Sequence, residues 1–184
     1  MRSTDRILTT HTGSLPRPAD LIDMIRAREQ GESVDEAKFQ ARVRSAVAET
    51  VQKQVDEGID VVSDGEEGKP SYATYVKNRL TGFEGERRMP IRIQGEARDY
   101  PEYTERRMAT TATILVRPTC NGPISWKDFE AVTRDIDNLK AAVDASKPVG
   151  TFMTAASPGV VSFFLGNDYY KTDDEYLEAL TAVM

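Results

Sequence analysis

The sequence predicts an α/β fold, in which short apolar strands alternate with amphipathic helices. Between Phe39 and Val55, apolar residues recur at spacings of three and four, which indicates a helix with one buried face. Gly58 follows as a helix stop, and the apolar run 59–62 comes directly after it. A helix, a glycine stop and a buried strand in this order are typical of α/β proteins.

The elements before this helix are short. Residues 7–10 predict a first strand, which runs into the loop 11–18, where two prolines and a glycine exclude regular structure. The helix that follows has an apolar face, made of Leu21, Ile22 and Ile25. Ser33 and Glu36 then form an S-x-x-E capping box, which predicts the start of the long helix.

The same order recurs in the second half of the chain. Residues 113–116 predict a strand, and Ser125 with Asp128 predicts the start of the helix after it. Residues 149–153 predict a further strand. Thr172 begins another capping box, which precedes the apolar face of a last helix.

The segment 82–107 interrupts this order. It is rich in arginine and glutamate, and residues 91–94 alternate apolar and polar side chains like an edge strand. We interpret the segment as an inserted hairpin arm over one mouth of the fold or as a subunit contact. A solvated excursion is the simpler alternative.

The length suggests an incomplete fold. A (β/α)8 TIM-type barrel needs eight strand–helix units in about 250 residues, whereas the 184 residues here contain about the first four. Four parallel units cannot close, and they leave open sheet edges. We therefore expect residues 1–184 to form a single incomplete barrel domain, with a smaller open sheet as the alternative.

Composition narrows the class of protein. Hydrophobic residues make up 39% and charged residues 29% of the chain, and the formal net charge is −6 without a basic cluster. Such a chain has no electrostatic reason to bind nucleic acid or an anionic membrane surface. One cysteine excludes an internal disulfide, and neither a signal peptide nor a membrane-length apolar run is present. We expect a cytoplasmic protein.

Candidate ligand residues follow the predicted strands, because ligands of α/β folds meet the carboxyl ends of the strands. The turn Thr12-Gly13-Ser14 follows the first strand. Its glycine would let a ligand approach backbone N–H groups, and Ser14 adds a hydroxyl. The turn fits a carboxylate, although a tight turn that needs glycine for its φ angle is the simpler interpretation.

Two carboxylates follow the second strand. Asp64 and Glu66 would share one face of an extended chain and could hold an ammonium group or a metal, or act as an acid/base pair. The alternative is a solvated acidic turn, because Glu67 follows and Lys69 is near.

Three further residues are weaker candidates. His11 is the only histidine, and a lone histidine is more often structural than catalytic, although its position at a strand end favours a functional role. Cys120 is a lone cysteine, more often a small buried residue. No cluster of histidine and cysteine has the spacing of a zinc site. Phe164 could stack on a flat ligand ring or pack in the core.

Together these motifs resemble one family. T-T-H-T-G-S-L-P-R-P at 9–18, S-D-G-E at 63–66 and N-G-P-I-S at 121–125 are similar to the catalytic domain of cobalamin-independent methionine synthase. They resemble even more closely the shorter stand-alone proteins related to that domain. The resemblance implies a (β/α)8 barrel that transfers a methyl group from 5-methyltetrahydrofolate, usually polyglutamylated, to the thiol of homocysteine, giving methionine.

The resemblance also implies roles for single residues. Thr12, Gly13 and Ser14 would hold the amino-acid end of homocysteine, Glu66 would contact its ammonium group, and Phe164 would lie near the pterin. The family binds zinc through His, Cys, Glu and Cys ligands on later strands. This chain does not reach them, and Cys120 does not match a ligand position. We therefore expect no metal ligand in this chain and an incomplete site for catalysis.

The sequence is also compatible with other functions. A related barrel could act on another thiol or resemble uroporphyrinogen decarboxylase. A non-enzymatic half-barrel could serve as a binding or assembly module. We expect small-molecule substrates and either a homo-oligomer or a complementary second half that covers the open sheet edges.

Overall fold

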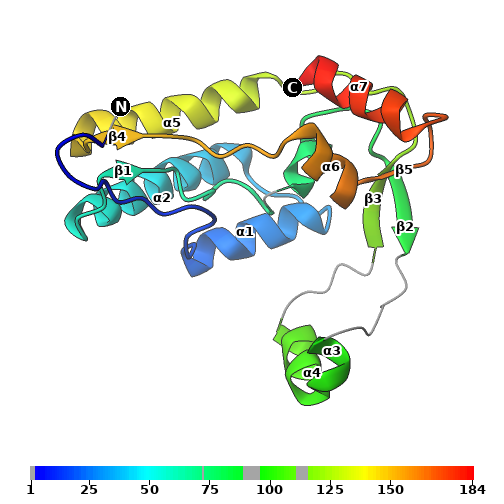
Figure 1. Cartoon of the computed structure of the whole chain (residues 1–184), viewed down its shortest axis with the longest axis horizontal. Helices are drawn as coiled ribbons and strands as arrows, with labels where there is room; N and C mark the ends of the chain where they lie inside the picture. Colours follow the sequence, from blue (N-terminus) through cyan, green and yellow to red (C-terminus); the bar gives the residue numbers. More distant parts are fainter. Residues whose placement is uncertain (1–2, 72, 89–95, 111–115) are drawn as a thin grey trace.

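The structure is a computed structural model that describes residues 3–71, 73–88, 96–110 and 116–184. Four helices of more than ten residues account for much of it: α1 (Ala19–Glu29), α2 (Glu36–Asp56), α5 (Glu130–Ser146) and α7 (Asp173–Val183). The strands are short and belong to two small sheets (Figure 1). In the described residues, no helix is both long and apolar enough to cross a membrane.

The first sheet is parallel. β1 (Val61–Val62) pairs with β4 (Gly150–Thr151), and Thr10 forms a parallel bridge to Val61 on the other side. The chain segment before Thr10 is fixed by Asp60, whose carboxylate pairs with Arg6 and accepts a hydrogen bond of 2.9 Å from the Thr9 amide. Three carboxyl-terminal strand ends therefore lie next to one another.

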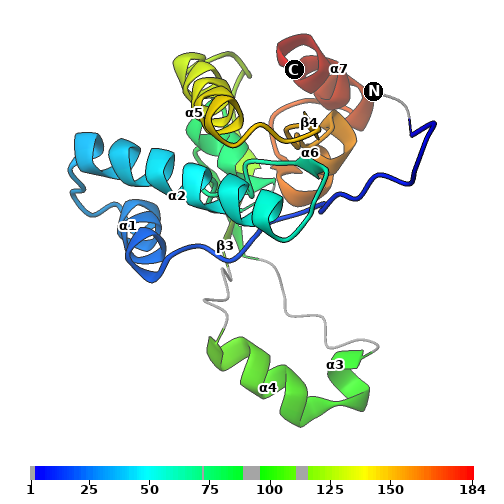
Figure 2. The same cartoon turned by 90° about the vertical axis from the view of Figure 1, so that its left-hand side faces the viewer.

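Helices α2 and α5 pack against each other beside this sheet, as Figures 1 and 2 show. α2 contributes one continuous apolar face, which joins Leu21 of α1, Val62 of β1 and Leu139 of α5 in one buried cluster. The predicted three-and-four spacing therefore matches the face of α2 that is buried. The face members are Phe39, Val43, Ala46, Val47 and Val51.

The second sheet is mixed. β2 (Gly85–Arg88) runs antiparallel to β3 (Val116–Cys120), and β3 pairs in parallel with β5 (Gly166–Asn167). A second buried cluster lies between this sheet, the 3-10 helix η1 (Thr74–Asn78), α6 (Pro158–Phe164) and α7. Leu165, Tyr176 and Leu180 are among its fully covered members.

The strand predicted at 113–116 is not a third strand of the parallel sheet. Residues 113–115 lie outside the described residues, and β3, which starts at Val116, pairs with β2 while β1 pairs directly with β4. An apolar run cannot distinguish a core strand from a hairpin strand. Pro118 lies opposite Glu86 of β2, and the parallel pairing of β3 with β5 begins only at Thr119, which suits a residue that has no N–H to donate to a ladder. The described residues thus form three parallel strand segments in one sheet, where four were predicted.

The predicted hairpin arm at 82–107 is only partly a hairpin. β2 within it is paired with β3, which lies beyond it, but α3 (Glu96–Asp99) and α4 (Pro101–Thr110) are helical. Proline suits the first position of a helix, and the residues after it are good helix formers, which explains α4. The edge strand predicted at 91–94 lies outside the described residues.

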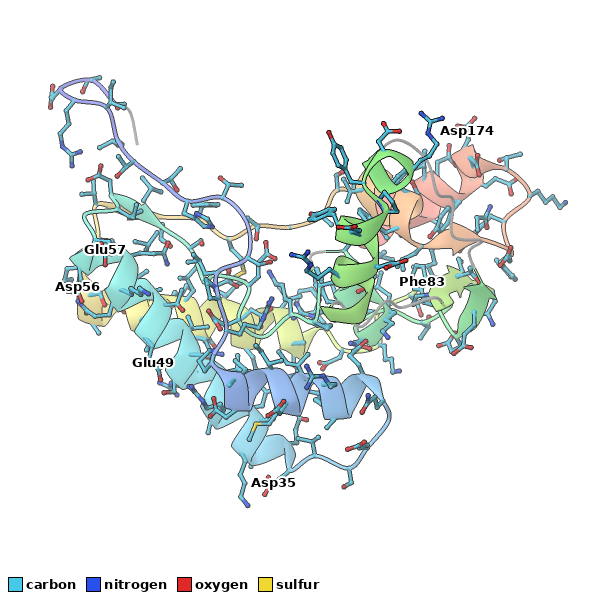
Figure 3. All side chains as sticks on the ribbon, turned by 90° about the horizontal axis from the view of Figure 1, so that it is seen from below. Asp35, Glu49, Asp56, Glu57, Phe83 and Asp174 are labelled. Carbon is cyan, nitrogen blue, oxygen red and sulfur yellow. The ribbon has the colours of Figure 1, made fainter. Side chains whose placement is uncertain are left out.

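The helix ends test the capping predictions. Thr172 caps α7 by accepting a hydrogen bond of 3.1 Å from the Glu175 amide, and Gly58 follows α2 with a φ of +79°. The cap of α2 is Asp35, not Ser33, and its carboxylate accepts from the Lys38 amide at 3.1 Å. Figure 3 shows Asp35 at one end of α2 and Glu57 at the other.

Of the predicted pair Ser125 and Asp128, Asp128 makes the capping bond at the start of α5. Its carboxylate accepts a hydrogen bond of 3.0 Å from the Ala131 amide. In both helices an aspartate nearer to the helix makes the capping bond, which aspartate and serine can make about equally well.

Leu180 should be essential to the second cluster, because its side chain is fully buried there. Leu180→Ala should lower the free energy of unfolding by about 2–5 kcal/mol, since it removes packed methyl groups and leaves a cavity. Leu177→Ala, on the same helix but half-buried, should cost clearly less. Urea denaturation of both variants measures the difference, and equal losses would contradict the packing described here.

Candidate functional site

A buried acidic turn follows β1. Gly65 and Glu66 have successive positive φ angles of +64° and +59°, so the chain reverses sharply there. The Asp64 carboxylate accepts a hydrogen bond of 3.1 Å from the Glu66 amide. Gln54 of α2 fixes the start of the turn by bonding both the carbonyl of Ser63 at 2.8 Å and its amide at 3.1 Å.

Arg17 clamps this turn from the first strand-end loop. Its guanidinium donates to the backbone carbonyls of Glu66 and Lys69 at 2.8 Å each, and to that of Glu67 at 3.3 Å. The Leu15 amide adds a hydrogen bond of 3.0 Å to the Gly65 carbonyl. The loop that carries the T-G-S-L-P-R motif is therefore tied to the D-G-E turn through the backbone.

The Glu66 carboxylate lies where three strand ends meet. Its Oε2 accepts a hydrogen bond of 2.5 Å from the Ser14 hydroxyl, and its Oε1 accepts one of 3.0 Å from the Thr154 hydroxyl. Ser14 follows the bridge at Thr10, and Thr154 follows β4. Glu66 is only 2% exposed. A carboxylate oxygen has two lone pairs, so each oxygen keeps capacity for one further donor.

Lys69 places a buried cation beside these groups. Its ammonium group lies 3.7 Å from the Asp64 carboxylate, donates to the Thr154 carbonyl at 3.2 Å and lies 5.3 Å from the centre of the Tyr75 ring. Both side chains of the Lys69–Asp64 pair are less than a tenth exposed. Attraction between them is therefore screened much less than at a surface.

Glu67 is the most deeply buried carboxyl group of the turn. Its Oε1 accepts a hydrogen bond of 2.8 Å from Thr50, while its Oε2 has no hydrogen-bond partner in the described part of the chain. Burial raises the pKa of Glu67 to about 7, because desolvation penalises the charged form more than the Thr50 hydroxyl stabilises it. Near neutral pH this group is therefore partly protonated.

The acidic turn differs from both expectations drawn from the sequence. Asp64 and Glu66 do not share a face by strand alternation, because the two positive φ angles replace the extended chain. The turn is not solvated either, since Asp64, Glu66, Glu67 and Lys69 are all less than a tenth exposed. Asp64 instead shapes the turn through its bond to the Glu66 amide.

The other predicted residues lie in different surroundings. Thr12 is exposed, and Gly13 has a φ of +108°, which only glycine adopts readily. His11 is half-buried, and its Nε2 has no hydrogen-bond partner among the described residues. Phe164 is half-buried on α6, edge-to-face with Phe163 at 5.3 Å between ring centres. Of the predicted ligand residues, hydrogen bonds join Ser14, Glu66 and Asp64 into one site.

Several residues of this site were not predicted as ligand or site residues. Arg17 and Thr154 lie in the predicted strand-end segments 11–17 and 154–159, and Lys69 lies three residues beyond the segment 63–66. Their position after a predicted strand was the signal that could have found them. Their hydrogen bonds could not be inferred from the sequence, because these bonds join one strand end to another.

A hollow of about 720 Å³ lies beside α1, η1 and β2. It shares Arg17 with the acidic turn, but its charged groups include both signs, and Lys77 is already paired with Glu29 at 2.7 Å. The acidic turn, unlike this hollow, joins the carboxyl ends of neighbouring parallel strands, where ligands of α/β folds bind, and it is the candidate site.

A zinc site does not fit the described residues. No group of three or more His, Cys, Asp or Glu side chains is arranged there to hold a metal ion. Cys120 is buried, and its thiol donates a hydrogen bond of 3.3 Å to the Gly122 carbonyl. Desolvation raises the pKa of Cys120, which is the opposite of what a metal-binding thiolate needs.

The fold and the turn define an α/β protein with a candidate ligand site at the carboxyl ends of neighbouring parallel strands. Residues 7–99 match the family described as the catalytic domain of the cobalamin-independent synthase. The chain belongs to this family. The matched residues include both the T-G-S-L-P-R loop and the D-G-E turn.

Curated relatives and a solved structure agree with this assignment. The chain is 33% identical to a methionine synthase of Pyrococcus furiosus and 26% identical to one of Sulfolobus acidocaldarius, each over 96% of this chain and 45% of the relative. A B12-independent methionine synthase from a Shewanella species has the same fold, with a TM-score of 0.65 over 93% of this chain and 44% of that one, at 21% identity. The chain therefore spans just under half the length of these proteins.

Gly65 should be intolerant of any side chain. A Cβ there would lie 2.7 Å from a methyl group of Thr50, and its φ is positive. Gly65→Ala should lower the free energy of unfolding by about 3 kcal/mol, from backbone strain and overpacking together.

Gly58 is the matched control, because it also has a positive φ but open space around it. Gly58→Ala should cost only about 1 kcal/mol. Chemical denaturation measures both losses. Equal losses in the two variants would contradict the close contact between Gly65 and Thr50 of α2.

Glu67 should make the protein less stable as pH rises toward 7. Its pKa is raised from 4.5 to about 7 on folding, so the folded state binds the proton more tightly than the unfolded state. Stability is therefore lost progressively between these two values and stays low above them. Glu67→Gln should remove this loss, which is on the order of 2 kcal/mol.

Urea denaturation at pH 5 and at pH 8 compares the wild type with Glu67→Gln. Glu178→Gln, an exposed change on α7, is the control that should keep the wild-type pH dependence. Parallel pH profiles for the wild type and Glu67→Gln would contradict the buried environment of Glu67.

Proposed function

We propose that this chain supplies the amino-acid-binding part of a site that transfers a methyl group from 5-methyltetrahydrofolate to the thiol of homocysteine, giving methionine. The observation that carries the proposal is the buried Glu66 carboxylate, bonded by Ser14 and Thr154 at the junction of three strand ends. Family membership and the names of the curated relatives support this choice of ligand.

The amino-acid end of homocysteine carries an ammonium group and a carboxylate. Glu66 would accept hydrogen bonds from the ammonium group in a site of low exposure, where charge-assisted bonds are strong. The turn Thr12-Gly13-Ser14 would receive the carboxylate through backbone N–H groups, as small left-handed turns commonly do for anions. Both contacts would fix the direction in which the thiol points.

The methyl donor would lie beyond the thiol. We propose Phe164 as a stacking partner for the pterin ring, because α6 begins only a few residues after Thr154. Positioning of the thiol against the N5-methyl group would supply much of the rate, since this methyl group is a poor electrophile. The protein's own contribution here is to bind and orient.

The zinc that the family implies would activate the thiol by stabilising its thiolate form. The described residues do not fit such a site, so no step proposed here uses the metal. His11 stays a low-ranked candidate in the substrate site, and Asp64 a supporting residue.

The architecture extends this proposal. We infer that Thr10, β1 and β4 mark the first strands of a (β/α)8 barrel, so that residues 1–184 would be one incomplete domain. The arm would run from about 82 to 107 and continue into β3. Cytoplasmic location and small-molecule substrates are part of the same proposal. The names of the relatives do not favour a decarboxylase-like or non-enzymatic role.

Glu66→Gln tests the ammonium contact in the full-length protein. It keeps the size of the side chain but removes its charge, so homocysteine affinity should fall by roughly tenfold or more. Affinity for 4-mercaptobutanoate, which lacks the amine, should change little. Isothermal titration calorimetry measures both ligands.

Glu178→Gln serves as the control and should leave both affinities unchanged. Homocysteine binding that is insensitive to Glu66→Gln would contradict the assigned contact. Absence of any homocysteine binding by the wild type would contradict the proposed substrate.

A further inference from the structure

The ammonium group of Lys69 is enclosed by groups from three elements. Asp64 of the same turn lies 3.7 Å away, the Thr154 carbonyl accepts its hydrogen bond at 3.2 Å, and the Tyr75 ring of η1 covers it at 5.3 Å. The residue is 3% exposed. Burying an ammonium group costs free energy, so its contacts must offset a large desolvation penalty.

A second cation also lies against the Tyr75 ring. The Arg79 guanidinium lies 4.8 Å from the ring centre and pairs with Asp135 of α5 at 2.6 Å. The ring of η1 is therefore linked to α5 through Arg79 and Asp135. Lys69 thus contacts both this ring and the Thr154 loop.

Thr154 links Lys69 to Glu66. Its backbone carbonyl accepts from Lys69, while its hydroxyl donates to Glu66 Oε1 at 3.0 Å. The loop after β4 is thus anchored to the acidic turn by two bonds from one residue.

We propose that Lys69 is a positioning residue for the ammonium-binding carboxylate. It holds the Thr154 loop against the acidic turn, so that the Thr154 hydroxyl fixes the orientation of Glu66. The inference rests on the proposed function, because it assumes that Glu66 receives the ammonium group of the amino acid. It adds Lys69 and Thr154 to the residues that set affinity for an α-amino group.

A simpler role in packing predicts a different side chain. A methionine would fill a similar volume against Tyr75 without the desolvation cost of a charge. Methionine could not donate to the Thr154 carbonyl or attract Asp64. The two roles therefore separate in a variant that keeps the volume and removes the ammonium group.

The test measures the ratio of the dissociation constants of 4-mercaptobutanoate and homocysteine in the full-length protein. This ratio reports the contact with the α-amino group and is insensitive to a general loss of stability. Lys69→Met should lower the ratio roughly tenfold, the range for losing one charge-assisted hydrogen bond. Lys77→Met, which removes a lysine of η1 that is paired with Glu29 of α1, is the matched control and should leave the ratio unchanged.

A double-mutant cycle tests the route through Thr154. Thr154→Val removes the hydroxyl on Glu66 and should lower the ratio to a similar extent. In the double variant the ratio should fall no further than in the more affected single variant, because both changes break the same link. Additive losses would overturn the route through Thr154.

Lys69→Met leaves Asp64 buried without its cation and could prevent folding. The second variant therefore combines it with Asp64→Asn, which removes the unpaired charge, and is compared with Asp64→Asn alone. The combined variant should again show a roughly tenfold lower ratio. Lys69→Arg, which keeps a cationic donor, should stay within about threefold of the wild type.

The outcomes separate the two proposals. If the wild type discriminates between the ligands but the ratio is unchanged in the Lys69 variants, Lys69 is a packing residue and this inference is wrong. If the wild type binds homocysteine no better than 4-mercaptobutanoate, the ammonium contact of Glu66 fails, and the role of Lys69 fails with it.

Discussion

The candidate site depends on a backbone reversal, the two successive left-handed residues Gly65 and Glu66. A left-handed conformation costs a non-glycine residue such as Glu66 on the order of 1–3 kcal/mol, and it persists only where surrounding contacts enforce it. Here Arg17 binds three carbonyls of the turn, and the Asp64 carboxylate binds the Glu66 amide. The reversal turns the Glu66 carboxylate toward Ser14 and Thr154.

The charges of the buried acidic turn nearly balance, which lowers the cost of burying it and bears on the kind of ligand that it can bind. Asp64 and Glu66 carry negative charges that Lys69 and Arg17 offset, while Glu67 is partly protonated near neutral pH because its pKa is about 7. The cluster is thus close to neutral before a ligand arrives. A zwitterionic amino acid adds no net charge, which avoids the cost of burying an unpaired ion.

Local chemistry was predictable from the sequence, and distant contacts were not. The cap at Thr172 and the helix stop at Gly58 follow from a few neighbouring residues. The burial of the acidic turn depends on Gln54 and Thr50 of α2 and on Arg17, which lie far away in sequence or on another element. Strand order was misjudged for the same reason, since the apolar run 113–116 fits either arrangement and the partners of β3, which are β2 and β5, decide its place.

The strand order explains why Glu66, rather than another strand-end carboxylate, is central. β1 lies between Thr10 and β4, so the residue that follows it has a neighbour on each side, Ser14 from one and Thr154 from the other. The hairpin of β2 and β3 is inserted between β1 and α5 and leaves the pairing of β1 with β4 intact. In the described residues, the strands of the inserted segment pair with each other and with β5, and not with the three strand ends that build the site.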